Sequence, residues 1–135
     1  MAGYSKRSLV EKVGIKEGFR VAILGGPPKY AHTLGKLPNG VKPASELRGT
    51  QDFIHFFTKS RRELEHTFPA LKSGLAQDGM LWISWPKASA GLETDLNENL
   101  VRDVGLRNQM VDVKVCAVDE IWSGLKFVIR LKDRK

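Results

Sequence analysis

The stretch Phe19-Arg20-Val21-Ala22-Ile23-Leu24-Gly25-Gly26-Pro27-Pro28 predicts a buried strand that ends in a tight loop. Its apolar, β-branched residues are typical of a strand inside a sheet, and the glycines and prolines that follow are typical of a turn. Further along the chain, Asp52–Thr58 and Met80–Trp85 are apolar runs of the same kind. Near-continuous apolar runs of this length favour strands that are covered on both faces, as in a parallel sheet.

A helical pattern separates the second and third of these strands. Ser60 and Glu63 form a capping box, and apolar residues then recur at spacings of three and four, which mark one face of a helix. We expect Pro69 to kink this helix or split it in two, because proline cannot donate the helical hydrogen bond. Asp78-Gly79 is expected to close the helix.

Two more helices are predicted. A second capping box, at Asp95 and Glu98, precedes another apolar helical face, and Gly105 is expected to end that helix. Near the start of the chain, Ser5–Val13 favours a short helix, and Gly14 is placed to end it.

The chain finishes with two strand patterns, Val111–Val118 and Leu125–Leu131, which we interpret as an antiparallel hairpin. Residues 29–50 are irregular, with room for one short strand near Val41. Alternating strands and helices imply right-handed crossovers and a parallel core. The sequence therefore predicts one α/β domain over residues 1–135. Its fold class is a compact Rossmann-like mixed sheet, mostly parallel, with an antiparallel C-terminal hairpin and helices on both faces.

The composition limits the kinds of partner. The net charge is +7, and the basic residues concentrate in residues 1–62, where 12 Lys/Arg stand against 4 Asp/Glu. Within this segment the basic residues are scattered along the sequence and form no cluster. We therefore interpret them mainly as a solvated surface, with nucleic acid as an alternative partner. No apolar run is long enough to span a bilayer, so no membrane partner is expected. Cys116 is the only cysteine, which favours a reducing, cytoplasmic location.

Two segments resemble class I S-adenosylmethionine-dependent methyltransferases. Val13–Gly25 resembles the helix, the Lys-x-Gly-x-x-Val turn and the first strand with which that fold opens, and Leu75–Ser84 resembles the approach to its fifth strand. The chain as a whole is similar to a small bacterial family of methyltransferase-like domains of unknown function. The resemblance implies a truncated methyltransferase-like fold and no particular activity. The similarity to this bacterial family rests on residues that include Gly3-Tyr4-Ser5, Trp85-Pro86-Lys87 and Trp122-Ser123-Gly124-Leu125.

The chain departs from the methyltransferase pattern where the cofactor would bind. That family has an acidic residue and then Gly-x-Gly-x-Gly at the end of its first strand, whereas this chain has Leu24-Gly25-Gly26-Pro27-Pro28. The two prolines remove two N–H donors. About 25 residues lead to Asp52, too few for the usual two strands and two helices, and Glu46 is the one acidic residue placed to hold a ribose. We therefore expect the nucleoside position to be closed off, with no cofactor favoured and S-adenosylmethionine the alternative.

A ligand of a parallel sheet binds outside the carboxyl ends of the strands. Four segments of the sequence are expected to meet at that face, and glycines there let a ligand approach the backbone closely. The candidate ligand-binding residues are Gly25, Gly26, Thr58, Lys59, Ser60, Trp85, Lys87, Asp119, Glu120 and Trp122.

Each of these candidates also has a structural interpretation. Thr58-Lys59-Ser60 opens a helix whose N–H groups can hold an anion, although a simple helix cap explains the same residues. Trp85 and Lys87 suit a stacked flat ligand, or else Trp85 plugs the end of the sheet, and Trp122 has the same two interpretations. Asp119-Glu120 is better explained as a pair of loop charges than as an acid–base pair, because adjacent residues point apart.

No metal site and no catalytic residue are predicted. His32, His55 and His66 have no ligand spacing with one another or with Cys116. His55 interrupts an apolar strand and is expected to be a hydrogen-bonded core residue, and Cys116, which lies inside a strand, is interpreted as a structural thiol.

Three functional hypotheses follow. The favoured one is a non-catalytic or cofactor-degenerate methyltransferase-like domain that binds a ligand or a protein partner at the strand-end face. The second is an S-adenosylmethionine-dependent methyltransferase with a remodelled pocket. The third is a nucleic-acid-binding domain that uses the basic surface.

Overall fold

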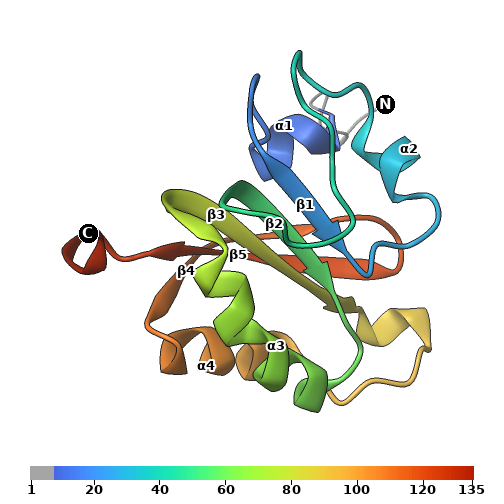
Figure 1. The fold of residues 1–135 in the computed structure, drawn as a ribbon. Helices are drawn as coiled ribbons and strands as arrows, with labels where there is room; N and C mark the ends of the chain where they lie inside the picture. The colour runs from blue at the N-terminus through green and yellow to red at the C-terminus, as the bar shows by residue number, and fades with distance from the viewer. Residues whose placement is uncertain (1–7) are drawn as a thin grey trace.

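A five-stranded mixed sheet forms the centre of the computed structural model, which describes residues 8–135 (Figure 1). The strands are β1 (Val21–Leu24), β2 (Gln51–Phe57), β3 (Leu75–Pro86), β4 (Met110–Ala117) and β5 (Trp122–Ile129). Their order across the sheet is β1-β2-β3-β5-β4. Strands β1, β2 and β3 are parallel, and β5 is antiparallel to both of its neighbours. The predicted sheet with its C-terminal hairpin is therefore confirmed.

Helices cover both faces of this sheet, as predicted (Figure 1). Each face has a hydrophobic core of its own, and adjacent residues of β2, such as Phe53 and Ile54, are fully buried in opposite cores. This explains the near-continuous apolar sequence of β2. The helices are α1 (Leu9–Val13) and α2 (Tyr30–Leu34) on one face, and α3 (Arg61–Ser73) and α4 (Glu98–Arg107) on the other, with short 3-10 turns at Ala88–Ala90 and Leu131–Asp133.

Helix α1 begins at Leu9 because Ser8 caps it. The Ser8 hydroxyl accepts a hydrogen bond from the backbone N–H of Glu11, at 3.4 Å. The helix was predicted from Ser5, and the part before Ser8 lies outside the described residues. Gly14 ends the helix as predicted, with a φ of 96° that favours glycine.

Helix α3 begins at its predicted cap, where the Ser60 hydroxyl accepts from the Glu63 N–H at 3.1 Å. The helix is not split at Pro69, since it runs on to Ser73. Pro69 is exposed and lacks the helical N–H donor, while the neighbouring apolar residues Phe68 and Leu71 stay buried. The predicted end at Asp78 is wrong. The Gly74 carbonyl accepts from the Gln51 N–H at 2.8 Å, and this bond draws the following residues into β3.

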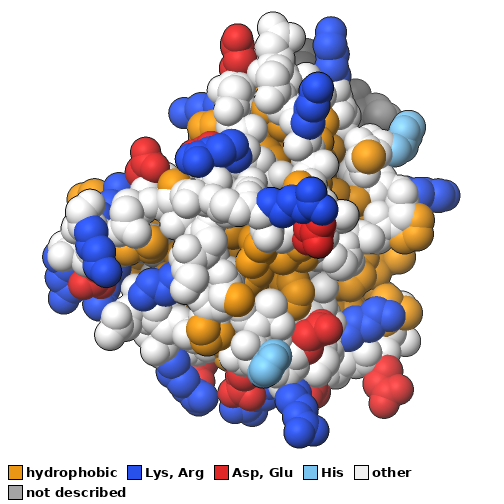
Figure 2. Space-filling model, viewed as in Figure 1, with side chains coloured by type: hydrophobic (Ala, Val, Ile, Leu, Met, Phe, Trp, Pro, Cys, Tyr) orange, Lys and Arg blue, Asp and Glu red, His pale blue; other side chains and the backbone are white. Residues whose placement is uncertain are grey.

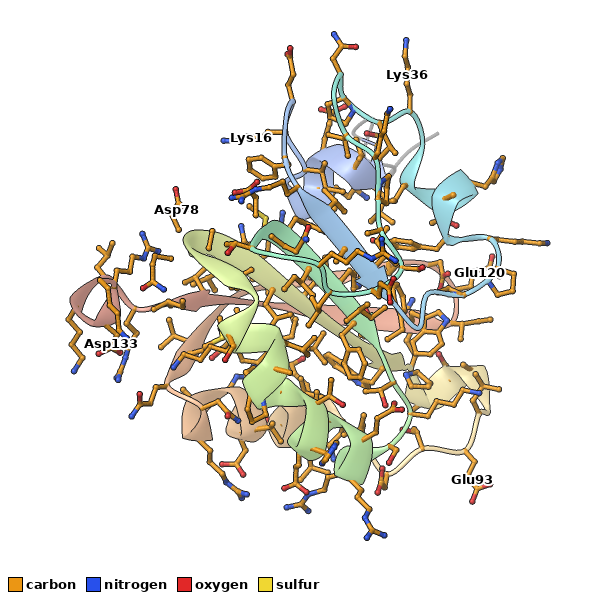
Figure 3. All side chains as sticks on the ribbon, viewed as in Figure 1. Lys16, Lys36, Asp78, Glu93, Glu120 and Asp133 are labelled. Atoms are coloured by element: carbon orange, nitrogen blue, oxygen red, sulfur yellow. The ribbon has the colours of Figure 1, made fainter. Side chains whose placement is uncertain are left out.

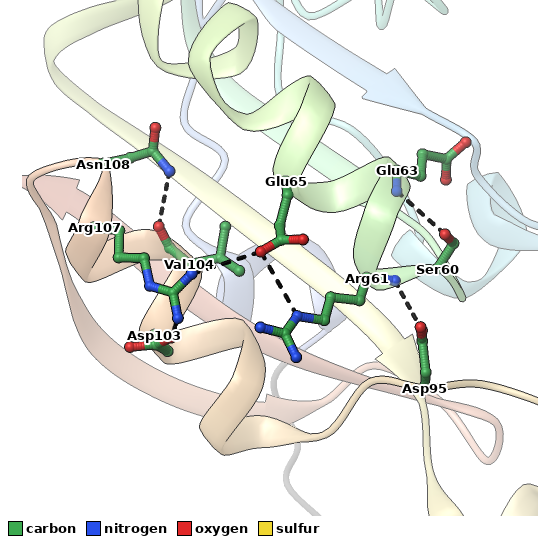
Figure 4. Close-up of polar contacts among 9 residues, drawn as sticks. All are labelled: Ser60, Arg61, Glu63, Glu65, Asp95, Asp103, Val104, Arg107 and Asn108. Atoms are coloured by element: carbon green, nitrogen blue, oxygen red, sulfur yellow. Dashed lines mark hydrogen bonds and ion pairs between the residues drawn. The ribbon is translucent and has the colours of Figure 1, made fainter.

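Helix α4 begins later and ends later than predicted. Its cap is Asn97, whereas the predicted cap, Asp95, accepts from the backbone N–H of Arg61 at 2.8 Å and so caps α3 instead (Figure 4). Gly105 lies inside α4 and does not end it. A Cβ atom at Gly105 would lie 2.0 Å from the ring of Phe127, so this glycine permits the helix to approach β5 closely.

Salt bridges tie the two helices of this face together. Glu65 of α3 pairs with Arg61 in its own helix and with Arg107 of α4, each at 3.6 Å (Figure 4). Arg107 also pairs with Asp103 one turn earlier. These side chains are about half exposed, so their individual contributions to stability are small.

The segment between β1 and β2 differs most from prediction. The expected strand near Val41 is absent, and helix α2, which the sequence did not predict, fills part of the segment. A single parallel bridge joins Ala44 to Ala22 of β1, with the Ile23 N–H donating to the Ala44 carbonyl at 2.8 Å. In doubly wound sheets two further strands lie beyond the first strand. Here that bridge is the only pairing on the outer side of β1 within residues 8–135.

Candidate ligand site at the carboxyl ends of the parallel strands

The turn Gly25–Pro28 leaves β1 at the carboxyl end of the sheet and has a hollow on each side. One hollow has a volume of about 420 Å³ and the other about 480 Å³, both within the range of small-molecule sites. We predicted that the prolines and the short following segment close off this position. The two hollows show that this expectation is wrong: α2 and the 43–45 segment pack beside the turn, and Gly25, Gly26 and Pro28 remain exposed, although Gly25 packs closely against the end of β2.

The first hollow, here called the α2 hollow, lies between the turn, helix α2 and residues 43–45. Its lining is mostly apolar. Figure 2 shows other hydrophobic side chains reaching the surface between the loop before β2 and helix α3. The residues lining the α2 hollow are Ile23, Gly25, Gly26, Pro27, Pro28, Tyr30, Ala31, Leu34, Leu37, Pro43, Ala44 and Ser45.

The second hollow, here called the β2 hollow, lies between the turn and the end of β2. It brings together six of the predicted residues, Gly25, Gly26, Thr58, Lys59, Ser60 and Trp122, and adds Pro27, Pro28, Phe57 and Glu63. The Thr58 hydroxyl donates to the carboxylate of Glu63, so this acidic side chain is held against the wall of the hollow. The sequence had identified Glu63 only as part of a helix cap.

Two N–H groups at the start of α3 are already paired within the protein, which disfavours the anion hypothesis. The N–H of Glu63 donates to the Ser60 hydroxyl, and the N–H of Arg61 donates to Asp95. The simpler interpretation of Thr58-Lys59-Ser60, as a helix cap, therefore agrees with the contacts.

Trp85 and Lys87 do not form a stacking platform. Trp85 is 5% exposed and lies in the core beneath α3 and α4, so it plugs the sheet. Lys87 is half-buried, its N–H donates to the Ile121 carbonyl at 2.7 Å, and it lines neither hollow. Trp122 is largely buried, and its ring meets Phe57 edge to face at 5.2 Å, so it forms a wall of the β2 hollow.

The two acidic residues of the hairpin loop have different surroundings. The Asp119 carboxylate accepts from the N–H groups of Ile121 and Trp122, both at 2.8 Å, which is a turn-forming role. Glu120 is exposed at the same end of the sheet (Figure 3). Neither residue lines the two hollows, which agrees with their interpretation as loop charges.

Glu46 stands at the level of the end of β1. Because Ala44 pairs with Ala22 in parallel register, Glu46 is level with Leu24, the last residue of that strand. This is the end of the sheet at which a ribose-binding carboxylate is expected. Glu46 also forms an exposed salt bridge with Arg48, so a ligand would share this carboxylate with the guanidinium.

A buried polar chain underlies the α2 hollow. His55 is fully buried, its Nδ1 is hydrogen-bonded to the Tyr30 hydroxyl at 2.5 Å, and its Nε2 to the Ser84 hydroxyl at 2.7 Å. Burial lowers the pKa of His55 to about 3, so the ring is neutral, and burial raises the pKa of Tyr30. The predicted core role of His55 is confirmed. Its partner Tyr30 was missed because α2 was not predicted.

Cys116 is half-buried, and burial raises the pKa of its thiol although Lys114 and Lys12 act in the opposite direction. A raised pKa disfavours the reactive thiolate. Within residues 8–135, no three His, Cys, Asp or Glu side chains are grouped closely enough to hold a metal ion. None of the helices formed by these residues combines the length and hydropathy that a bilayer crossing requires.

Solved structures share this fold. A crystal structure of an S-adenosylmethionine-dependent methyltransferase from Aquifex aeolicus is 16% identical with a TM-score of 0.66, over 90% of this chain and 88% of that chain. Magnesium protoporphyrin IX methyltransferase from Synechocystis, solved with bound S-adenosylmethionine, is 14% identical with a TM-score of 0.58, over 90% and 74%. A tRNA methyltransferase from B. subtilis is 14% identical with a TM-score of 0.56, over 98% and 69%.

No protein-family model matches the chain, and no curated protein sequence matches it. The identities to the solved structures are low, so the likeness is one of fold. The predicted resemblance to a truncated class I methyltransferase is confirmed at that level.

Proposed function

We propose that this chain binds S-adenosylmethionine across the Gly25–Pro28 turn and uses it as a methyl donor. The observation that carries the proposal is the open hollow on each side of this turn, in a fold that solved S-adenosylmethionine-dependent methyltransferases share. Doubly wound sheets bind nucleotide ligands at this position, outside the carboxyl ends of the strands.

The residues around the turn fit the parts of this cofactor. The apolar α2 hollow suits a flat base, and Glu46, level with the end of β1, can accept hydrogen bonds from ribose hydroxyls. The β2 hollow offers the carboxylate of Glu63 to a cationic group. Pro27 and Pro28 cannot donate, so the backbone N–H groups that the turn can offer are those of Gly25 and Gly26. We therefore expect this turn to bind the cofactor more weakly than a loop with three glycines does.

When bound, the cofactor would supply a methyl group activated by a positively charged sulfur. The chain's own residues hold and orient the reactants. The Thr58 hydroxyl fixes the Glu63 carboxylate, whose negative charge attracts the cationic end of the donor into the β2 hollow. Phe57 and Trp122 form an apolar wall that keeps water from one side of that hollow.

Calorimetry and thermal unfolding with S-adenosylmethionine and S-adenosylhomocysteine test the proposal. At a ligand concentration 100 times its Kd, the protein should gain about 2.7 kcal/mol in free energy of unfolding. Ala31→Trp, which places an indole in the α2 hollow, should abolish the gain. Ala88→Trp is the matched control, because Ala88 is an exposed alanine that lines neither hollow, and this variant should keep the gain.

The same measurements separate the proposal from its main alternative. If neither ligand binds, methyl transfer is excluded, and non-catalytic binding of another ligand or of a protein partner at this face becomes the better hypothesis. Equal loss of binding in the Ala31→Trp and Ala88→Trp variants would argue against the α2 hollow as the site.

A further inference from the structure

We propose that the sheet face beside α1 binds the phosphodiester backbone of a nucleic acid through Lys12, Lys16, Lys114 and Lys126, here called the lysine face. Three parts of the chain meet there: α1 with the turn that follows it, β4 and β5. The inference goes beyond the proposed function, and its test does not require cofactor binding.

The strand register places two of these lysines directly opposite each other. Lys114 of β4 pairs with Lys126 of β5, and Lys126 is opposite Trp82 of β3 on its other side. The Lys114 ammonium donates to the Lys12 carbonyl at 2.9 Å, and the Trp82 indole N–H donates to the Val13 carbonyl at 2.8 Å. Lys114, Trp82 and Lys126 therefore share the face on which α1 lies.

This arrangement is electrostatically unfavourable for the protein alone. Like charges directly opposite each other on neighbouring strands destabilise a sheet. Burial lowers the pKa of Lys126, and the nearby charges of Lys114 and Lys16 lower it further. Between described residues, the salt bridges are all made by arginine, so none of them neutralises these lysines. Like charges that are placed together without a neutralising partner are typical of a functional surface.

Helix capping alone does not explain the cluster. Lys114 has a structural role, because its ammonium binds a carbonyl near the end of α1. That role needs one lysine. Lys16 is exposed in the turn after α1 and is drawn at the edge of the molecule in Figure 3, and Lys126 is only partly buried. Neither donates a side-chain hydrogen bond within the described part of the chain, so both can donate to a ligand.

The chemistry of the face favours phosphate over a protein partner. Lysine is depleted from protein–protein interfaces, whereas its compact ammonium is a common phosphate ligand.

The lysine face is also close to the proposed active site. Trp122, at the start of β5, borders the β2 hollow, and Lys126 lies on the same face four residues later, roughly 13 Å along the strand. Phosphates repeat about every 3.4 Å along each strand of a duplex, so a stretch of a few base pairs covers this span and one nucleic acid can reach both.

Fluorescence anisotropy with a labelled 20-base-pair RNA duplex and its DNA counterpart tests this inference over 50–200 mM salt. The Lys114→Met/Lys126→Met variant should bind at least tenfold more weakly. Its plot of log affinity against log salt should be shallower by about 1.8, because each lost phosphate contact removes about 0.9. The RNA and DNA measurements show which nucleic acid is preferred, and binding of either supports the assignment.

The matched control is Lys36→Met/Lys42→Met, which removes the same charge from exposed positions between α2 and β2. Lys36 is labelled in Figure 3. It should change affinity by less than threefold. Lys16→Glu, at an exposed turn, gives a second test if the loss of the Lys114 contact unfolds the first variant; it should weaken binding similarly.

Three results would overturn the inference. The first is an equal loss of affinity in the two double variants, which would indicate a diffuse charge effect. The second is binding that does not change with salt. The third is that poly-glutamate or vesicles of anionic lipid bind as tightly as the duplex and lose affinity in the same variant. The lysine face would then bind negatively charged molecules in general and not nucleic acid in particular.

Discussion

The protein should lose roughly 3 kcal/mol of unfolding free energy between pH 7.5 and pH 4.5 because of His55 alone. The pKa of this fully buried histidine is lowered from 6.5 to about 3, so the folded state keeps the ring neutral while the unfolded chain binds a proton. Stability is therefore at its plateau above pH 6.5. Below that value it falls by about 1.4 kcal/mol per pH unit until the pH approaches 3.

Urea unfolding of the wild-type protein and of His55→Gln at several pH values measures this effect. Glutamine retains polar atoms and does not titrate, so the variant should lose stability at neutral pH and show a shallower decline towards pH 4.5. Asp52, whose pKa is lowered by its bidentate contact with Arg20, adds an acid sensitivity common to both proteins. Parallel pH profiles in the two proteins would contradict the prediction.

If the single variant does not fold, a triple variant serves instead. Removing one member of the buried chain leaves its partners without hydrogen bonds, at about 1–3 kcal/mol for each unsatisfied group. Tyr30→Phe/His55→Leu/Ser84→Ala removes the whole chain and leaves no orphaned group. Its stability should be nearly independent of this titration.

Protonation of His55 should also affect the α2 hollow. Tyr30 lies in α2, lines that hollow and is hydrogen-bonded to His55 in the middle of β2. The bond ties the short helix to the sheet. We therefore expect acid to weaken the wall of the proposed cofactor site before the α3 and α4 side of the sheet is affected.

The sequence predicted the sheet well because local patterns specify it. Apolar runs identified β2 and the second half of β3, and the alternation of Val111–Val118 identified β4. Errors arose where distant contacts decide a boundary. Asp95 caps α3 although it lies 34 residues away in the sequence. Gly105 lies within a helix, where a larger residue would clash with the ring of Phe127. Neither contact leaves a local signal.

The candidate site was predictable only in part. Its position followed from the parallel sheet, and Gly25, Thr58 and Ser60 do line one hollow. The expectation of a closed site failed because it counted residues after β1 without knowing their path. One bridge at Ala44 replaces a strand and leaves space beside the turn. A residue count gives the length of a segment and does not show which surface it leaves uncovered.

Gly25→Ala should lower the free energy of unfolding by about 1–3 kcal/mol more than Gly18→Ala does. Both glycines have positive φ, 68° and 76°, so an added side chain imposes similar backbone strain at both. At Gly18 a Cβ atom would meet nothing within 4 Å. At Gly25 it would lie 2.7 Å from the carbonyl oxygen of Phe57, and one of the two backbones would have to move.

The same pair of variants tests the proposed cofactor site. Moving the turn away from β2 alters both hollows at once, because Gly25 lines each of them. We expect Gly25→Ala to weaken S-adenosylmethionine binding at least tenfold, and Gly18→Ala to leave it unchanged because Gly18 lines neither hollow. Chemical unfolding and calorimetry provide the two measurements. Equal destabilisation would refute the steric argument at Phe57. Unaltered binding in a folded Gly25→Ala protein would show that the ligand does not lie across this turn, since any ligand there depends on the close contact between Gly25 and β2.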